Sequence, residues 1–283
     1  MTPVVSVRGL RKSYGEFEAL KGIDFELRAG EVFGLLGPNG AGKTTTVEIL
    51  EGYRHRDAGD VAVLGADPAT TDSHWRGRIG VVLQSSAMYE NLTVTESLAQ
   101  FAGYYERPRP VADVIELTGL EEKRNDRVRR LSGGQRRRLD LGLALIGDPE
   151  LIFLDEPTTG FDPGARRRAW ETIRSLSALG KTILLTTHYL DEVEQLADRV
   201  AVLRGGRIVA SGTVQDLTRA TAATEIRYRR NGEEVVLETE EPTRVLNELT
   251  TQAIRRGEEL EGLEVRRPSL EEVYLSLTQG ETE

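Results

Sequence analysis

The chain has 283 residues, of which 39% are hydrophobic and 29% charged, and this composition is typical of a globular protein with a sizeable core. Its formal net charge of −9 disfavours a main surface that binds nucleic acid, and the lack of cysteine excludes a disulfide framework and a thiolate metal site. The longest apolar runs, such as "LIFL" at 151–154, are far shorter than the roughly 20 residues of a membrane-spanning helix. Because the first residues show no secretory signal, we expect a cytosolic protein.

The acidic charge is concentrated at the C-terminal end. Residues 221–283 contain fifteen Glu and eight Arg, without Asp or Lys, so this segment carries −7 and the remaining 220 residues only −2. Such a change in composition predicts a second module. We therefore expect one domain over residues 1–220 and an accessory or regulatory domain over residues 221–283.

The N-terminal segment predicts strands with one buried face. Ile23, Phe25 and Leu27 are spaced two apart, so their side chains fall on one side of an extended chain. We expect an antiparallel β subdomain here.

Apolar runs without alternation follow, and these predict strands that are covered on both faces. They are "VFGLL" at 32–36, "IGVVL" at 79–83, "LIFL" at 151–154 and "TILLTT" at 182–187. In open parallel sheets, ligands bind beyond the carboxyl ends of the strands. The runs are followed by polar residues that we expect along one rim of the sheet: Lys43, Gln84, Asp155, Glu156 and His188. The pattern predicts an α/β fold with a mainly parallel sheet.

The middle of the chain predicts a helical subdomain over about residues 90–150. Leu139, Leu143 and Ile146 recur at i, i+4 and i+7, which is helical periodicity. Further on, "VAVLRGGRIVASGT" at 200–213 predicts two strands joined through Gly205 and Gly206.

The C-terminal segment predicts a small α+β appendage. The turn "NG" at 231–232 lies between two strand-like stretches, which indicates a hairpin. Pro242 is expected to open a helix, and "LEVRR" at 263–267 is expected to form a strand. "SLEE" at 269–272 predicts a capping box in which Ser269 and Glu272 close the first turn of a last helix.

The stretch "GPNGAGKT", from Gly37 to Thr44, fits the P-loop pattern between a predicted strand and a helix. Its glycines let backbone N–H groups approach phosphates, Lys43 can reach the β- and γ-phosphate oxygens, and Thr44 can hold Mg²⁺. A nucleotide and Mg²⁺ are the expected cofactors. The residues expected to bind the nucleotide here are Gly37, Pro38, Asn39, Gly40, Ala41, Gly42, Lys43, Thr44 and Thr45.

Side chains at the other strand ends suggest hydrolysis. Asp155 is the expected partner of Mg²⁺, and Glu156 can accept a proton from the water that attacks the γ-phosphate. His188 can contact the γ-phosphate or hold that water, and Gln84 can act around the metal and the water. The alternative for each of these four residues is an ordinary role in a loop or a helix cap. The presence of a P-loop in the same chain disfavours that alternative.

A second glycine-rich helix start lies at "LSGGQ", residues 131–135. Ser132 can cap the helix, and the N–H groups of Gly133 and Gly134 can bind an anion, with Gln135 following. This stretch follows no predicted strand and has no lysine. A simple glycine-rich cap is the alternative, but two anion sites in one chain make sense if the second serves the nucleotide of another chain.

The order of "GPNGAGKTT", Gln84, "LSGGQ", "LIFLDEP", "TTGFDP" and His188 resembles the nucleotide-binding subunit of an ATP-binding cassette (ABC) transporter, over about residues 4–215. The resemblance implies a head-to-tail dimer with a second copy or a homologous ATPase subunit. Each ATP would lie between the P-loop of one subunit and Ser132–Gln135 of the other. It also implies that Tyr14 stacks on the adenine and that Asp162 couples the two sites.

The tail ending in "RPSLEEVYLSLTQG" is similar to that of ATPase subunits of bacterial exporters of drugs, antibiotics or polysaccharides, whose membrane permease is a separate chain. In such transporters the segment "YENLTVTESL" at 89–98 meets the permease. This resemblance implies a cytoplasmic protein bound peripherally to the inner face of the cell membrane. It does not reveal the transported compound.

Other classes of function compete with a transport ATPase. Residues 123–138 carry eight Lys or Arg against one Asp, which suggests a nucleic-acid-binding ATPase, although a solvated helix face beside a phosphate site explains the run better. A kinase or nucleotide switch lacks support, because neither a second-substrate site nor a guanine-reading motif is evident. We therefore expect no nucleic-acid partner.

Overall fold

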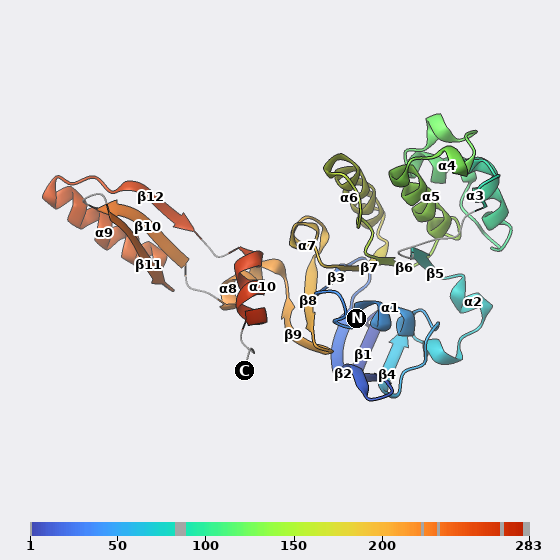
Figure 1. Cartoon of the computed structure of the whole chain (residues 1–283), viewed down its shortest axis with the longest axis horizontal. Coiled ribbons are helices and arrows are strands. Elements are labelled where there is room, and N and C mark those ends of the chain that lie inside the picture. Colours follow the sequence, from blue (N-terminus) through green and yellow to red (C-terminus); the bar gives the residue numbers. More distant parts are fainter. Residues whose placement is uncertain (1, 83–88, 222–223, 231–232, 267–268, 280–283) are drawn as a thin grey trace. The chain divides into compact units, whose positions relative to one another are not determined.

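The computed structural model describes residues 2–82, 89–221, 224–230, 233–266 and 269–279. The chain divides into two units, Met1–Ser211 and Gly212–Glu283 (Figure 1). The boundary expected after residue 220 lies inside the second unit, at the end of helix α8 (Val214–Thr221).

The first unit combines two sheets of different kinds. Its strands are β1 (Val5–Tyr14), β2 (Phe17–Leu27), β3 (Val32–Leu36), β4 (Ala58–Val63), β5 (Ile79–Val82), β6 (Leu151–Asp155), β7 (Thr182–Thr187), β8 (Arg199–Arg204) and β9 (Arg207–Gly212). Strands β2, β1 and β4 form an antiparallel sheet in that order. The larger sheet has the order β5-β6-β7-β3-β8-β9, and the pairs from β5 to β8 are parallel. The predicted fold class is confirmed.

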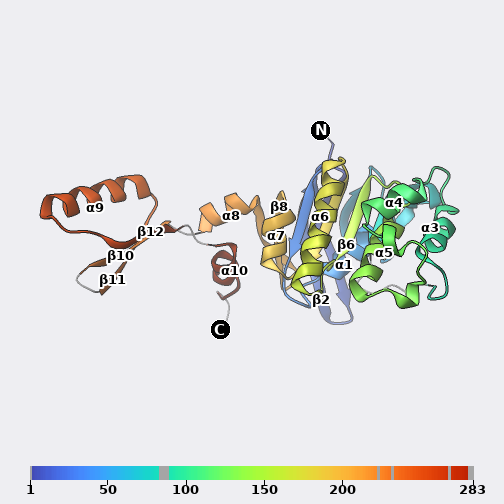
Figure 2. The ribbon, with the colours of Figure 1, turned by 90° about the horizontal axis from the view of Figure 1, so that it is seen from above.

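The helices of the first unit either pack on its sheets or build the helical subdomain. They are α1 (Lys43–Leu50), α2 (Ser73–Arg76), α3 (Val94–Ala102), α4 (Val111–Leu117), α5 (Gly133–Leu145), α6 (Pro163–Ala178) and α7 (Leu190–Leu196), with the 3₁₀ turns η1 (Pro68–Thr70), η2 (Glu121–Lys123) and η3 (Val128–Arg130). Side chains alternate across the sheet, so Leu151 and Phe153 of β6 pack with α1 and the antiparallel sheet. Ile152 and Leu154 pack on the other face with α5, α6 and α7 (Figures 1 and 2). Burial on both faces explains why these strands read as continuous apolar runs.

The helical subdomain has a core of its own. The predicted face of α5 is buried there, since Leu139 and Ile146 are fully covered and Leu143 packs against them. Thr93 caps α3 with Glu96 in a capping box. None of the helices in the described residues is both long and apolar enough to cross a membrane.

The second unit contains a three-stranded antiparallel sheet with the order β11-β10-β12. Its further elements after α8 are β10 (Thr224–Arg230), β11 (Glu233–Thr239), α9 (Pro242–Arg256), β12 (Glu261–Arg266) and α10 (Leu270–Gln279). The capping box is present, because the side chains of Ser269 and Glu272 each bond the backbone N–H of the other. The expected turn at residues 231–232 lies outside the described residues.

Candidate nucleotide-binding site

The P-loop joins the end of β3 to the start of α1, and its backbone is closely packed at Gly37 and Gly42. A Cβ on Gly37 would lie 2.3 Å from the carbonyl oxygen of Leu203. Gly42 has φ +108°, and a Cβ there would lie 2.7 Å from Leu20 Cδ2. Only glycine fits both positions. Gly42 also leaves the first turn of α1 without a side-chain cap, so its N–H groups can bind phosphate oxygens.

Lys43 is the buried cation of this loop, with 5% of its surface exposed. Its Nζ donates to the carbonyl oxygens of Gly37 at 2.8 Å and Pro38 at 3.2 Å. The same Nζ lies 3.2 Å from Glu156 Oε1. The P-loop lysine and the expected catalytic carboxylate are thus in direct contact.

Asp155 ends β6 beside the P-loop helix. Thr44 Oγ1 donates to Asp155 Oδ2 at 3.2 Å, and Thr186 Oγ1 donates to Oδ1 at 2.5 Å. These contacts bring together two of the three residues expected to hold Mg²⁺. The third, Gln84, lies outside the described residues.

Glu156 occupies a sharp turn, with φ +47°, a conformation that non-glycine residues adopt rarely and often at functional sites. Its N–H donates to the carbonyl oxygen of Thr186, and its Oε2 accepts from Thr159 Oγ1 at 3.1 Å. Burial by itself would raise the pKa of this carboxyl, but the charge of Lys43 and hydrogen bonds outweigh it and leave the pKa below its ordinary value. Glu156 is therefore a carboxylate near neutral pH.

His188 follows β7, and its Nδ1 lies 3.3 Å from Glu156 Oε1. Its ring packs on Tyr189, with the ring centroids 4.0 Å apart. The structure thus places His188 beside the same carboxylate that Lys43 contacts.

Tyr14, at the end of β1, lies beside the P-loop helix and is 41% exposed. Its hydroxyl is 3.4 Å from Thr45 Oγ1, and the Arg54 guanidinium carbon lies 5.2 Å from the ring centroid. An exposed aromatic face next to the phosphate loop can stack on a base.

The second helix start, at α5, carries the predicted cap. Ser132 Oγ accepts from the N–H of Gln135 at 3.3 Å, and Gln135 Oε1 accepts from the N–H of Ser132 at 2.9 Å. A Cβ on Gly133 would meet no atom within 4 Å, so the backbone there is open to a ligand.

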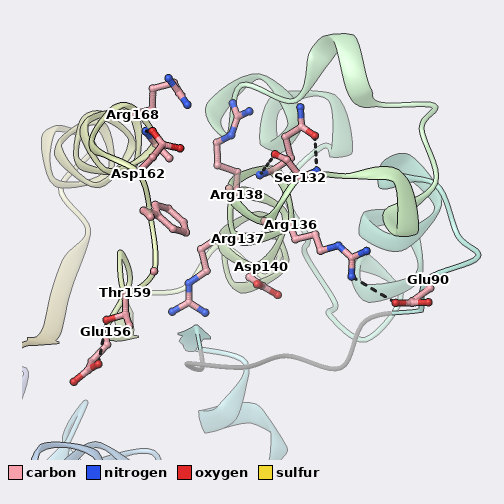
Figure 3. Close-up of a pocket in the computed structure, with 16 residues that line it drawn as sticks. Glu90, Ser132, Arg136, Arg137, Arg138, Asp140, Glu156, Thr159, Asp162 and Arg168 are labelled. Carbon is pink, nitrogen blue, oxygen red and sulfur yellow. Dashed lines mark hydrogen bonds and ion pairs between the residues drawn. The ribbon is translucent and has the colours of Figure 1, made fainter. Parts of the chain in front are cut away.

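This helix start faces a cavity of about 1020 Å³. Figure 3 shows Ser132 at the start of α5 and Asp162 at the start of α6 on its two sides. Asp162 Oδ1 accepts from the N–H of Ala165 at 2.8 Å and caps α6. Glu156 reaches the cavity wall, but the lining includes no residue between Gly37 and Thr45. The cavity therefore contains the "LSGGQ" stretch and Glu156 but no residue of the P-loop.

The basic run at residues 123–138 is not a solvated helix face throughout, and that interpretation is wrong for Arg137 and Arg138. Arg137 donates to the carbonyl oxygens of Asp155 at 3.0 Å and Pro157 at 3.3 Å, while Arg138 donates to that of Gly119 at 2.6 Å. Burial lowers the pKa of Arg137. Sequence reasoning missed Arg137 as a residue that ties α5 to the strand end carrying Asp155. The signal in the sequence that could have indicated this role is the position of Arg137 in the first turns of α5.

The residues present fit ATP and Mg²⁺. Thr44 and Asp155 offer neighbouring hard oxygen ligands, and the described residues contain no cluster of three or more acidic, His or Cys side chains that would bind a metal alone. Mg²⁺ is commonly held by one or two protein oxygens together with the phosphates of its substrate. The uncapped P-loop helix and Lys43 supply the matching phosphate site.

A parallel sheet with a P-loop between β3 and α1, and a carboxylate at the end of a neighbouring strand, defines a P-loop nucleotide-binding protein. Comparison with known proteins gives the family. The family model described as ABC transporter matches residues 20–159. The chain belongs to this family: it is the ATP-binding subunit of an ABC transporter, and an ATPase.

Two curated relatives and one solved structure illustrate the match. Nod factor export ATP-binding protein I of Ralstonia nicotianae is 46% identical over 221 residues, which cover 76% of this chain and 69% of the relative. Daunorubicin resistance ATP-binding protein DrrA3 of Streptomyces coeruleorubidus is 39% identical, and the match covers 97% of this chain and 95% of the relative. A solved structure of an ATP-binding subunit of an ABC transporter superposes with a TM-score of 0.71 at 25% identity. The superposition covers 97% of this chain and 99% of the chain in that structure.

Proposed function

We propose that two copies of this chain, or one copy and a homologous subunit, enclose two ATP molecules between them in a head-to-tail dimer. The observation that carries the proposal is the separation of the two anion-binding helix starts. Residues 132–135 face a cavity that no P-loop residue lines. An ATP held by Lys43 and the P-loop therefore needs the "LSGGQ" stretch of another subunit to be fully enclosed.

In this dimer the P-loop and Lys43 hold the β- and γ-phosphates, and Tyr14 stacks on the adenine. Thr44 and Asp155, with Gln84, hold Mg²⁺, which neutralises charge on the phosphate oxygens when it is bound. Ser132, Gly133, Gly134 and Gln135 of the opposite subunit cover the γ-phosphate. Asp162, which lines the same cavity as Ser132, links the two sites.

Glu156 orients the attacking water and accepts its proton. Its pKa below the ordinary value keeps the carboxylate available at neutral pH, and its contact with Lys43 holds it next to the phosphate site. His188, whose Nδ1 lies 3.3 Å from Glu156 Oε1, holds the water or contacts the γ-phosphate. Closing of the dimer on ATP and reopening after hydrolysis drive the transport step.

The partner of the dimer is an integral membrane permease on a separate chain. Segment 89–98 fits this contact, because Tyr89 is 60% exposed and the segment is hydrogen-bonded to the rest of the helical subdomain. The N–H groups of Val128 and Arg129 donate to the carbonyl oxygens of Leu92 and Glu90. Movement of the helical subdomain would therefore be transmitted to this segment. The chain accordingly acts at the cytoplasmic face of the cell membrane, without a nucleic-acid partner.

Export is the direction that the relatives favour, because one is named for Nod factor export and the other for daunorubicin resistance. We extend this to drugs, antibiotics or polysaccharides as cargo classes. Purification of the chain from its native membrane, with identification of the protein that accompanies it, tests the proposal. A soluble or nucleic-acid partner in place of a membrane protein would contradict it.

The domain over residues 221–283 serves either as a dimer contact or regulatory surface, or as a solubilising cap. Its acidic excess and capped last helix are compatible with both roles. Deletion of residues 221–283 separates them: a fall in ATPase activity and dimer mass supports the first, and unchanged values support the second.

Glu156→Gln tests the catalytic assignment. The variant should bind ATP, accumulate as a dimer and hydrolyse ATP about 10²–10⁴-fold more slowly, which is the usual contribution of a general base. Light scattering and phosphate release measure both effects. Hydrolysis at the wild-type rate would show that another group accepts the proton.

A further inference from the structure

Glu192 is a fully buried carboxyl that the mechanism above does not use. It lies in α7 with 0% of its surface exposed. Its Oε1 accepts from Thr158 Oγ1 at 2.8 Å and from Trp170 Nε1 at 3.2 Å. Its Oε2 is buried and accepts no hydrogen bond of good geometry in the described part of the chain, although the Thr187 side chain lies close enough to oppose the effect of burial on the pKa of the carboxyl. Burial raises the pKa of this carboxyl.

The partners of Glu192 belong to the segments that carry the expected site residues. Thr158 lies in the turn between Glu156 and Asp162, and Trp170 lies in α6, which Asp162 caps. Glu192 itself lies in α7, which begins two residues after His188. One carboxyl oxygen therefore joins three segments around the site.

This arrangement is costly for the fold. A buried carboxyl without a full set of hydrogen bonds destabilises a protein, and an apolar side chain of similar volume is commonly more stable at such a place. Two other buried carboxyls have full partners, since Asp155 bonds Thr44 and Thr186 and Glu31 pairs with Arg199 at 3.1 Å. The contacts of Glu192 point to a role in arranging the site.

We propose that Glu192 is a positioning residue of the ATPase: it fixes the turn between Glu156 and Asp162 against the segment that carries His188. It touches neither ATP nor the attacking water. The inference rests on the roles proposed above for Glu156 and His188. A displacement of Glu156 or His188 by about 1 Å lowers the rate of the chemical step. It leaves ATP binding largely intact, because Glu192 does not contact the nucleotide.

The test compares Glu192→Met with Glu192→Gln in the full chain. Methionine fills the volume but accepts neither hydrogen bond, so kcat should fall about ten- to a hundred-fold while KM for ATP stays within about twofold. The melting temperature should not fall. Glutamine keeps a carbonyl oxygen for Thr158 and Trp170 and should retain about half of kcat or more. Thr158→Val removes one of the two hydrogen-bond donors, so its kcat should lie between those of Glu192→Met and Glu192→Gln.

Glu31→Gln is the matched control, because Glu31 is also buried and hydrogen-bonded but lies outside the site. It should lower the melting temperature and leave kcat unchanged. Wild-type kcat in Glu192→Met would overturn the inference. A fall of kcat and melting temperature together, without rescue by glutamine, would also overturn it. Failure of the proposed function is read separately, from unchanged hydrolysis by Glu156→Gln.

Discussion

Replacing Glu51 by glutamine should make the stability of the first unit less dependent on pH. Glu51 follows α1, and its Oε1 is buried without a hydrogen-bond partner in the described residues. Burial, with the nearby negative charges of Asp155 and Glu48, raises the pKa of Glu51 from its ordinary value of 4.5 to about 8. The folded chain therefore keeps a proton that the unfolded chain releases.

The sign of the effect follows from this difference in proton binding. The stabilising contribution of protonated Glu51 is complete below pH 4.5 and is lost as the pH rises toward 8. The loss is about 1.4 kcal/mol for each pH unit within that range. Between about pH 5.5 and 7.5 the wild type should lose about 2.5 kcal/mol more stability than Glu51→Gln, which has no proton to release.

Urea denaturation, followed by tryptophan emission at several pH values, measures the difference. Both tryptophans, Trp75 and Trp170, lie in the first unit, so the signal reports on that unit. The difference between the two proteins removes the contributions of other titrating groups. Parallel stability curves for the wild type and Glu51→Gln would refute the reasoning.

Three further substitutions have defined expectations. Gly42→Ala places a Cβ 2.7 Å from Leu20 at φ +108°, so it should abolish ATP binding in a fluorescent-nucleotide titration, whereas retained affinity would show that the loop can move. Ser132→Ala removes the cap of α5 and should cost about 1 kcal/mol of unfolding free energy, which Ser132→Thr should restore. Arg137→Met leaves the carbonyl oxygens of Asp155 and Pro157 without their charged donor and should cost about 2 kcal/mol, and a neutral result in denaturation would contradict the tie between α5 and β6.

Local pattern was sufficient to predict most of the elements. Strands buried on both faces give apolar runs such as residues 151–154, and the alternation of Ile23, Phe25 and Leu27 reflects the half-buried antiparallel sheet. Capping residues such as Ser132 and Ser269 indicate where helices begin. These signals depend on neighbours in the sequence and can be read without the fold.

Contacts between distant segments could not be predicted in the same way. Arg137 looks like a surface residue in a charged run, and only the approach of α5 to the end of β6 turns it inward. Glu192 reads as part of an acidic, solvent-facing helix, but Thr158 and Trp170 lie 34 and 22 residues away in sequence and bury it. Spacing carries no information about such pairs, because tertiary packing decides which side chains meet.

The central claim, that each ATP is shared by two subunits, is tested most directly by mixing two inactive variants. Lys43→Ala disables the P-loop, and Gly134→Glu disables the "LSGGQ" stretch while leaving the P-loop intact. A mixed dimer then has one site with both parts functional, so an equal mixture should recover roughly a quarter of wild-type hydrolysis if subunits pair at random and the sites act independently. Activity that stays at the sum of the two separate variants would contradict a site shared between subunits.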